Sequence, residues 1–537
     1  MNDVPELLSW LKKRDTWLSD TVQNEIIETM ARAIQKQILE KLQDCEFVGV
    51  IADGTTDCAG EEQFSICLQF SNKDIQIENC FVGMYNVPDS TGATLASAVK
   101  DVLLRFNVPL AKLQGISFDG AANMSGKYEG VQSILKKDCP GSLYVHCSNH
   151  SLDLVLQEVS RQIRGFADAL LFVRNTANLL RRSSKRKTVF ASMFEDEDKV
   201  IALSSICPTR WCVRRTAIQK VILSYKAILG TLAQIKADKN NRGEVQSTAS
   251  GLHKQAMESR TYFFLLSSQA IFGECEAVAK ILQGVQVTAK AVMDSIALLQ
   301  KAILRIRTDT QFQEFLRETE QKTEEYGLTM TRKRQVATPA AIRHDGRKTT
   351  EEKLPDAQKW KIQLFEPLDL IQVQLTRRFD QQDLVVAVAR ENLLLNSELT
   401  DTDYATSKLP RNFDWDKLRR QILQLRDMFE VRNEQMVSVV QIAQLLLSLD
   451  PLTRSLFSEV KRLVSLIQCQ PISAASCERS FSCLRRLKTW LRSTMTQKRF
   501  THLALLSTHR DTVTHLELTP FLNEFCRKTP ERASVFG

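Results

Sequence analysis

The sequence predicts a mixed α/β fold for the first third of the chain and a helical remainder. Three segments typical of β-strands come first, and segments typical of helices and strands then alternate. From residue 216 to about residue 467 the pattern is almost wholly helical. A meander of three antiparallel strands followed by parallel strands with crossover helices predicts a mixed sheet covered by helices.

The expected elements follow one another in a simple order. A first helix is expected over 26–42, because apolar residues recur there at three- to four-residue spacing between charged ones. Short polar turns then separate three strands, and crossover helices separate the last two strands. The expected strands are 47–52, 63–70, 75–85, 113–118 and 143–145, and the expected helices after the meander are 94–106, 128–136 and 152–180.

The composition is that of a folded protein with a small excess of positive charge. Of 537 residues, 72 are Lys or Arg and 63 are Asp or Glu, so the net charge is +9. This excess does not by itself establish a nucleic-acid partner, and the placement of the charges must decide. The thirteen Cys show no tight framework and no secretory signal is seen, so reduced thiols in the cytosol or nucleus are expected. No transmembrane helix and no membrane partner are expected, because no run of about eighteen apolar residues occurs.

Two aspartates stand directly after predicted strands. Asp53 follows the first strand and Asp119 follows the fourth, where α/β proteins tend to place their sites. If the two strands are neighbours, the carboxylates converge, and two or three convergent carboxylates are what a pair of Mg²⁺ ions needs for phosphoryl transfer. The alternative is that each Asp only caps a turn or a helix.

Three further motifs carry polar chemistry. Cys147 and His150 have a Cys-x-x-His spacing, but a structural zinc needs four ligands and no others complete the set, so structural zinc is not expected. The pair Arg210-Trp211 could hold a phosphate and stack on a base, or could be a core Trp beside an Arg. Basic clusters at 181–187, 332–334 and 485–492 are either solvated faces, a phosphate track or nuclear import signals.

Glu478 opens a predicted helix near the end of the chain. A Glu in a first helical turn is often only a complement to the helix dipole. The helix carries an apolar stripe, and a second stripe follows shortly after; both could be a dimer surface or part of the core. The stripes are Phe481, Leu484, Leu487 and Leu491, and then Phe500, Leu503, Leu505 and Leu506.

Taken together, five segments resemble hAT-type transposases, in the subgroup that includes host proteins derived from such elements, such as zinc-finger MYM-type and kinase-inhibitor-repressor proteins. The last segment resembles the hAT C-terminal dimerisation signature. The resemblance covers nearly the whole chain, and the motifs stand in the family's order. The segments are Asp53-Gly54-Thr55-Thr56-Asp57, 118–124, Cys147-Ser148-Asn149-His150, Pro208-Thr209-Arg210-Trp211 and 473–495.

The resemblance implies an RNase H-like mixed sheet core interrupted by a large all-α insertion domain. It implies that Asp53, Asp119 and Glu478 are the catalytic carboxylates and hold Mg²⁺ or Mn²⁺ for DNA cleavage and strand transfer. Asp57 stays an alternative to Asp53 as the first of the three. The expected segments are a helical segment 1–45, a first part of the core 46–215, a helical insertion 216–467, and a final part of the core with the dimerisation region 468–537.

The resemblance also assigns residues to DNA. Cys147 and His150 match the family's Cys-x-x-His, and Arg210 and Trp211 match a pair that acts near a flipped base. The expected partners are DNA, as transposon ends or non-specific duplex, and a second copy of the chain in a homodimer or higher oligomer.

Two functions compete. One is a metal-dependent DNA transposase, favoured by the complete acidic triad. The other is a domesticated, non-catalytic descendant that acts as a DNA- or protein-binding dimerisation module, favoured by the absence of a paired Cys-x-x-Cys and His arrangement for reading DNA sequence. A nuclear location is expected for both.

Overall fold

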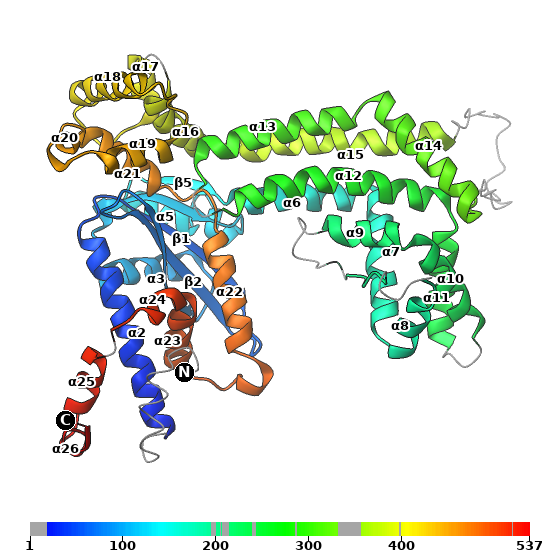
Figure 1. Ribbon diagram of the computed structural model, residues 1–537, viewed down its shortest axis with the longest axis horizontal. Helices are drawn as coiled ribbons and strands as arrows, with labels where there is room; N and C mark the ends of the chain where they lie inside the picture. The colour runs from blue at the N-terminus through cyan, green and yellow to red at the C-terminus, as the bar shows by residue number, and fades with distance from the viewer. Residues whose placement is uncertain are drawn as a thin grey trace. The chain divides into compact units, whose positions relative to one another are not determined.

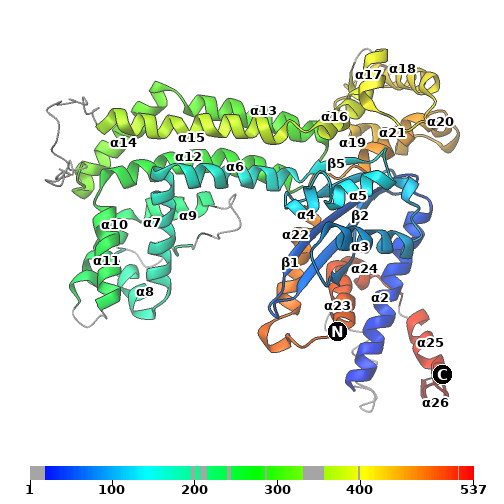
Figure 2. The same ribbon diagram turned by 180° about the vertical axis from the view of Figure 1, so that it is seen from behind.

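The structure is a computed structural model that describes residues 19–194, 200–204, 206, 214–238, 243–284, 287–330, 356–396, 399–517 and 519–536. The chain divides into two compact units (Figures 1 and 2). The first, here called the sheet unit, comprises Met1–Ser151, Leu282–Val292 and Asp380–Gly537. The second, here called the helical unit, comprises Leu152–Ile281 and Met293–Phe379.

A five-stranded mixed sheet forms the centre of the sheet unit, in the order β3-β2-β1-β4-β5. β1 pairs antiparallel with β2, and β2 pairs antiparallel with β3, whereas β1–β4 and β4–β5 are parallel. This confirms the predicted meander followed by parallel strands. The strands are β1 (Val48–Thr56), β2 (Glu62–Ser71), β3 (Ile77–Asn86), β4 (Leu113–Phe118) and β5 (Leu143–His146).

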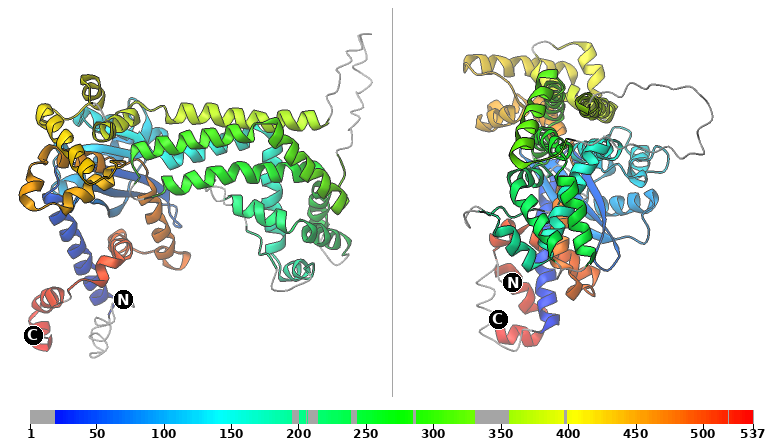
Figure 3. Two further views of the ribbon diagram at one scale, coloured as in Figure 1. Left: turned by 45° about the horizontal axis from the view of Figure 1, so that its top comes forward. Right: turned by 90° about the vertical axis from the view of Figure 1, so that its right-hand side faces the viewer.

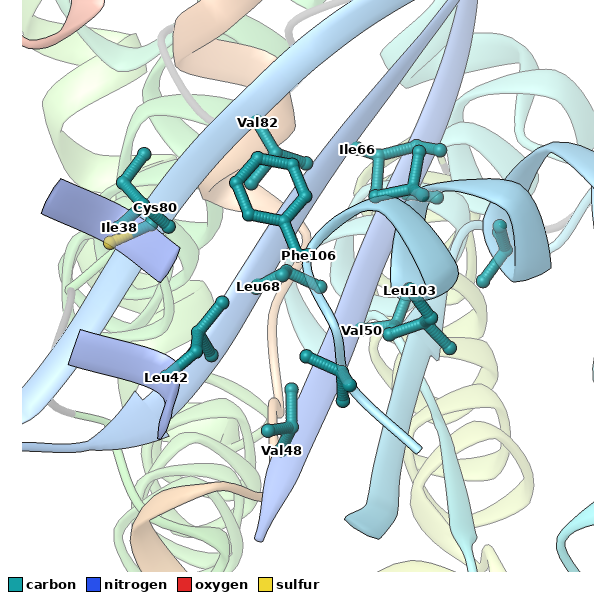
Figure 4. Close-up of a cluster of buried hydrophobic side chains, with 14 of the residues drawn as sticks. Ile38, Leu42, Val48, Val50, Ile66, Leu68, Cys80, Val82, Leu103 and Phe106 are labelled. Carbon is teal, nitrogen blue, oxygen red and sulfur yellow. The ribbon is translucent and has the colours of Figure 1, made fainter. Parts of the chain in front are cut away.

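Three helices cover one face of this sheet: α2 (Asp20–Gln43), α3 (Gly92–Arg105) and α5 (Val131–Asp138). Alternate residues of the strands point to this face, as the period of two along a strand requires. Figure 4 shows Val48 and Val50 of β1 in this core with Phe106 after α3. The layer also holds Ile38, Leu42, Ile66, Leu68, Cys80, Val82 and Leu103.

The intervening strand residues point to the opposite face. Ile51, Cys67 and Phe81 pack there against α22 (Ala475–Leu487) and α23 (Gln497–Thr508). A separate apolar core beside Phe47 and Ile75 joins four helices of the sheet unit. These helices are α16 (Gln382–Leu395), α18 (Trp415–Val431), α19 (Val439–Ser448) and α21 (Ser458–Gln468).

Short elements complete the sheet unit. Between strands and helices lie η2 (Leu110–Lys112), α4 (Ala122–Ser125), α17 (Asp401–Ser407), α20 (Pro451–Ser455) and η6 (Trp490–Arg492). The chain ends with α24 (Arg510–Thr514), α25 (Thr519–Arg527) and α26 (Pro530–Phe536).

The helical unit contains only helices in its described residues, drawn in teal to yellow-green in Figure 3. α13 and α15 lie side by side, where Gln372 Nε2 donates to the Gln300 carbonyl at 2.6 Å. The helices are α6 (Ser148–Gln162), which begins in the sheet unit, α7 (Arg164–Arg181), α8 (Ser184–Ala191), α9 (Arg214–Leu223), α10 (Tyr225–Ala237), α11 (Gly243–Ala256), α12 (Ser259–Leu282), α13 (Ala289–Ile306), α14 (Asp309–Tyr326) and α15 (Asp356–Phe379).

Several local expectations need correction. The helix expected over 152–180 is two helices, because the backbone of Ile163 is extended between α6 and α7. Residues 380–467, expected within the helical insertion, group with the sheet unit. The apolar stripes on α22 and α23 are core rather than surface, since Leu484, Phe500 and Leu505 are buried against the sheet. Leu491 lies outside the side chains that the structure describes.

None of the helices in the described residues has both the length and the apolar character that crossing a membrane requires.

Candidate functional site

The site lies beside the end of β4. Asp119 follows β4 as expected, but Asp53 lies within β1 rather than after it, because β1 continues to Thr56. Asp53 sits near the end of β1, opposite Ser65 of β2, and its side chain shares the face of Ile51. Asp119 follows β4, the parallel neighbour of β1, so both carboxylates come from adjacent strands at one edge. The Asp53 Oδ1 accepts from the Gly54 N–H at 2.8 Å, and the Asp119 Oδ1 accepts from the Ala121 N–H at 3.2 Å.

Glu478 reaches the same place from the far end of the chain. It lies in the first turn of α22, which packs across β1 and β2. The Ser480 hydroxyl meets the Ser65 hydroxyl at 2.8 Å, directly beside Asp53 in the strand register. The Cys477 thiol lies 3.5 Å from the Ile51 carbonyl. These buried contacts fix α22 over the strand that carries Asp53.

Asp53 feels the charges of the other two carboxylates. Burial and the negative charges of Asp119 and Glu478 raise the pKa of Asp53 well above its usual range. Like charges that are forced together favour protonation of one member. Asp53, Asp119 and Glu478 are nevertheless partly exposed as residues, so solvent reaches this part of the sheet unit.

A glycine pair lets the chain approach the strands before α22 begins. Gly49 of β1 and Gly115 of β4 are register partners. A Cβ on Gly49 would lie 2.0 Å from the Cys469 carbonyl oxygen, and one on Gly115 would lie 2.6 Å from Pro471 Cδ. The segment that leads to Glu478 therefore crosses the sheet at a point where only glycine fits.

Side-chain amides hold this crossing segment in place. Gln69 Nε2 donates to the carbonyls of Gln468 and Gln470, at 2.8 and 3.2 Å. The Ser148 N–H donates to the Ile472 carbonyl at 3.1 Å. Contacts with β2 and with the start of α6 thus fix the path of the chain into α22.

The Cys147–His150 motif touches this same path. The Cys147 thiol accepts from the Ala474 N–H at 3.1 Å, and the Asn149 Nδ2 donates to Glu478 Oε1 at 3.3 Å. Cys147 is fully buried, so its thiol positions the start of α22 and cannot contact DNA in this conformation. Burial and the charges of Glu478 and Asp53 raise the pKa of Cys147 to about 12, so the thiol stays protonated.

The other residues expected at DNA are placed as follows. His150 is partly exposed, and its ring centroid lies 5.7 Å from that of His146. A Cβ on Gly120 would lie 2.7 Å from the ring of His146. Because Gly120 follows Asp119 in the chain, His146 lies beside Asp119. Arg210 and Trp211 lie outside the described residues.

The structure separates Asp57 from the carboxylate group. The Asp57 side chain, 0% exposed, forms an ion pair with Lys488, whose side chain is 2% exposed. Burial acts to raise the pKa of Asp57, but hydrogen bonds from Lys488 and from the Ala59 and Glu61 N–H groups hold it below its usual range. Because these partners occupy Asp57, Asp53 is the aspartate of β1 that is available to a ligand.

The three carboxylates are chemically suited to bind a hard divalent cation. Three carboxylates supply oxygen ligands only, and a cation would relieve the repulsion that raises the pKa of Asp53. Within the part of the chain that the structure describes, no three His, Cys, Asp or Glu side chains already stand at ligand positions around one point. Binding would therefore require the side chains to turn towards a shared ion.

Sequence reasoning missed three groups that shape this site: Asn149 as the donor to Glu478, the Gly49–Gly115 pair, and the Asp57–Lys488 ion pair. The glycines had a signal, since each stands four residues before a site aspartate. The ion pair joins residues 431 positions apart and had none.

Two family models match the chain. Residues 7–130 match an RNase-like domain described as ZMYM1/FAM200, and residues 434–512 match the hAT family C-terminal dimerisation region. The first match covers all of β1–β4 with Asp53 and Asp119, and the second covers α22 with Glu478. These matches confirm the resemblance to hAT-type, transposase-derived proteins.

Curated relatives resemble nearly the whole chain. The protein named "52 kDa repressor of the inhibitor of the protein kinase" from Homo sapiens is 22% identical over 519 residues. The match covers 93% of this chain and 66% of the relative, so the chain spans just under two thirds of that protein. The Mus musculus protein of the same name is 23% identical over 521 residues, with 93% and 67% of the two chains covered.

Proposed function

We propose that this chain, a hAT-like, transposase-derived protein, uses Asp53, Asp119 and Glu478 as a divalent-cation site for cleaving and joining phosphodiester bonds of DNA. The observation that carries the proposal is the placement of Asp53 and Asp119 on adjacent parallel strands, with Glu478 on the helix that packs across β1 and β2. Burial and the two neighbouring carboxylates raise the pKa of Asp53, in keeping with this placement. Such a repulsive, partly exposed acidic group costs stability and is typical of a site that waits for a ligand.

The chain's own residues would do three things in this reaction. Asp53 and Asp119, on adjacent parallel strands, and Glu478, from α22, would hold Mg²⁺ or Mn²⁺. Asn149 would orient the Glu478 carboxylate through its amide. The Asp57–Lys488 ion pair would keep the end of β1 and the end of α22 together. A bound cation of this kind supplies a nucleophile at neutral pH and neutralises charge on the phosphate.

The architecture supports the same proposal. The mixed sheet, with its aspartates on β1 and after β4, lies largely within the segment that matches an RNase-like domain, which supports an RNase H-like core. We propose that the helices between β5 and α22 form the family's all-α insertion, which separates Asp119 from Glu478 in sequence; its later helices, from Gln382 onwards, pack with the sheet unit.

A second candidate function is regulatory. The two relatives are named as repressors of an inhibitor of the protein kinase, and those names describe the relatives alone. In a domesticated, nuclear role of this kind, the chain would bind DNA or protein as a self-associating module without cleaving DNA. The match to the hAT dimerisation region supports self-association for either function.

Cation binding tests the proposal without assuming catalysis. The thermal unfolding temperature of the wild-type chain should rise with millimolar Mg²⁺ or Mn²⁺, because a ligand that binds only the folded state stabilises it. The rise should vanish in Asp119→Asn. It should persist in Asp74→Asn, which removes the same charge from an exposed turn. An equal rise in both variants would overturn the assignment of the site.

A further inference from the structure

A second polar surface, outside the acidic site, lies wholly in the helical unit. It is a groove of about 750 Å³ between α7, the start of α8 and α11. Three arginines line it, Arg174 and Arg182 from α7 and its C-terminal cap and Arg186 from α8. We call it the arginine groove.

The sequence places these side chains in one row. Arg174, Asn178 and Arg182 are spaced four residues apart, so they share one face of α7. The opposite face of α7 is buried, with Phe172, Val173 and Leu180 in the core of the unit. Because a helix rises 1.5 Å per residue, the two outer arginines stand about 12 Å apart along the axis.

The described residues of the groove leave most of its positive charge without an ion pair. None of the three arginines forms an ion pair with any residue that the structure describes, whereas nearby Lys185 pairs with Asp238 at 2.7 Å. The Nε of Arg186 is buried and has no hydrogen-bond partner among the described residues. Among the lining residues that the structure describes, Glu244 of α11 is the one acid, against three arginines. A row of guanidinium groups with no ion-pair partner among the described residues fits an anionic ligand that brings several charges at that spacing.

We infer that the arginine groove binds the phosphate backbone of duplex DNA. Phosphates along one strand are spaced about 3.4 Å apart on the helix axis, so the row spans three to four of them. Guanidinium groups pair with phosphate oxygens through two hydrogen bonds, and the amides of Asn175 and Asn178 line the same groove. Such contacts fix the position of a duplex without reading its sequence.

This inference rests on the proposed function for DNA as the partner, but it concerns a different surface. Arg174 and Arg182 are exposed, so replacing their side chains should leave the fold intact and change only the charge of the groove. The full chain is compared with the triple variant Arg174→Ala/Arg182→Ala/Arg186→Ala. The matched control is Lys226→Ala/Lys301→Ala/Arg305→Ala, which removes the same charge from exposed positions outside the groove.

The measurement is fluorescence anisotropy with a 30-base-pair duplex over a series of salt concentrations. The slope of the logarithm of the association constant against the logarithm of the salt concentration should become less steep by about 0.9 for each arginine that neutralises a phosphate. In the triple variant the change should be up to about 3. Binding at 0.1 M salt should weaken at least about tenfold, and the control should keep most of the slope and affinity.

The failures can be told apart. If the wild-type chain binds the duplex and the two triple variants lose the same amount of affinity, the arginine groove is not the binding site, but the protein still binds DNA. If the wild-type chain binds no duplex, or binds polyglutamate or single-stranded RNA in its place, both this inference and DNA as the partner are wrong. Mg²⁺-dependent stabilisation through Asp119 is measured separately and does not depend on either result.

Discussion

The side-chain amide of Asn149 donates to the Oε1 of Glu478 at 3.3 Å, across 329 positions of sequence. Asn149 is buried at the start of α6, and its own Oδ1 lies 3.5 Å from Gln283 Nε2. This amide therefore touches the carboxylate and is itself contacted from its other end. Asn149 is therefore a positioning residue for the acidic site.

Asn149→Ala should weaken Mg²⁺ or Mn²⁺ binding about 10- to 100-fold, the usual effect of losing a group that orients a metal ligand. Its fold should survive, because one buried hydrogen bond contributes only about 1 kcal/mol. Calorimetric titration of the metal measures the loss. Asn412→Ala, an exposed amide far along the chain, is the control, and equal binding by both variants would remove Asn149 from this role.

Asp53→Asn should stabilise the metal-free protein near neutral pH. The folded protein raises the pKa of Asp53, so it binds a proton more tightly than the unfolded chain, and stability falls as pH rises from about 4 through the raised value. Asparagine removes this loss, so the unfolding temperature of the variant should exceed the wild-type value by a few degrees at pH 7. The difference should shrink towards pH 4.

Differential scanning calorimetry over pH 4 to 8 in chelating buffer gives this comparison. With Mg²⁺ present the order should reverse, because only the wild type binds the ion. A variant less stable than wild type at pH 7 without metal would show that the carboxylate group is not strained by its own repulsion.

Gly115→Ala should destabilise the protein and also disturb the acidic site. The new methyl group would stand 2.6 Å from Pro471 Cδ and 2.8 Å from the Cys469 carbonyl oxygen, so the segment leading to Glu478 must move. Overpacking of this kind costs about 1–3 kcal/mol. Denaturant unfolding and metal titration should both respond. Gly141→Ala, where the nearest atom is 3.8 Å away, should change neither.

Self-association should depend on apolar side chains that the fold leaves exposed in the matched dimerisation region. Leu452 and Leu456 are 83% and 61% exposed there, whereas the stripes on α22 and α23 are buried. Leu452→Gln/Leu456→Gln should lower the mass measured by light scattering at micromolar concentration. Leu104→Gln/Leu223→Gln, equally exposed but outside that region, should not. No difference between the two pairs would place the interface elsewhere.

The sequence was informative where the signal is local. Alternating and β-branched segments predicted the five strands along the chain and the meander followed by parallel strands. The sequence left open whether the strands of Asp53 and Asp119 are neighbours, and it ended the first strand before Asp53, whereas β1 continues to Thr56. Sequence alone could not show that Asp57 is occupied, because its partner Lys488 lies at the far end of α22. Apolar periodicity could not tell a core stripe from a surface stripe, since both have the same spacing; only the buried Leu484 and Phe500 decide it.

Cleavage of DNA is the most direct test of the acidic site. Supercoiled plasmid is incubated with the full chain and Mg²⁺ or Mn²⁺, and nicked and linear products are measured against time. We expect metal-dependent cleavage that falls at least about 100-fold in Glu478→Gln, because removal of a metal-ligating carboxylate removes the cation's position. Glu524→Gln, an exposed acid on α25, should retain wild-type cleavage. Cation binding without any cleavage by the wild-type chain, or cleavage undiminished in Glu478→Gln, would contradict the proposed catalysis.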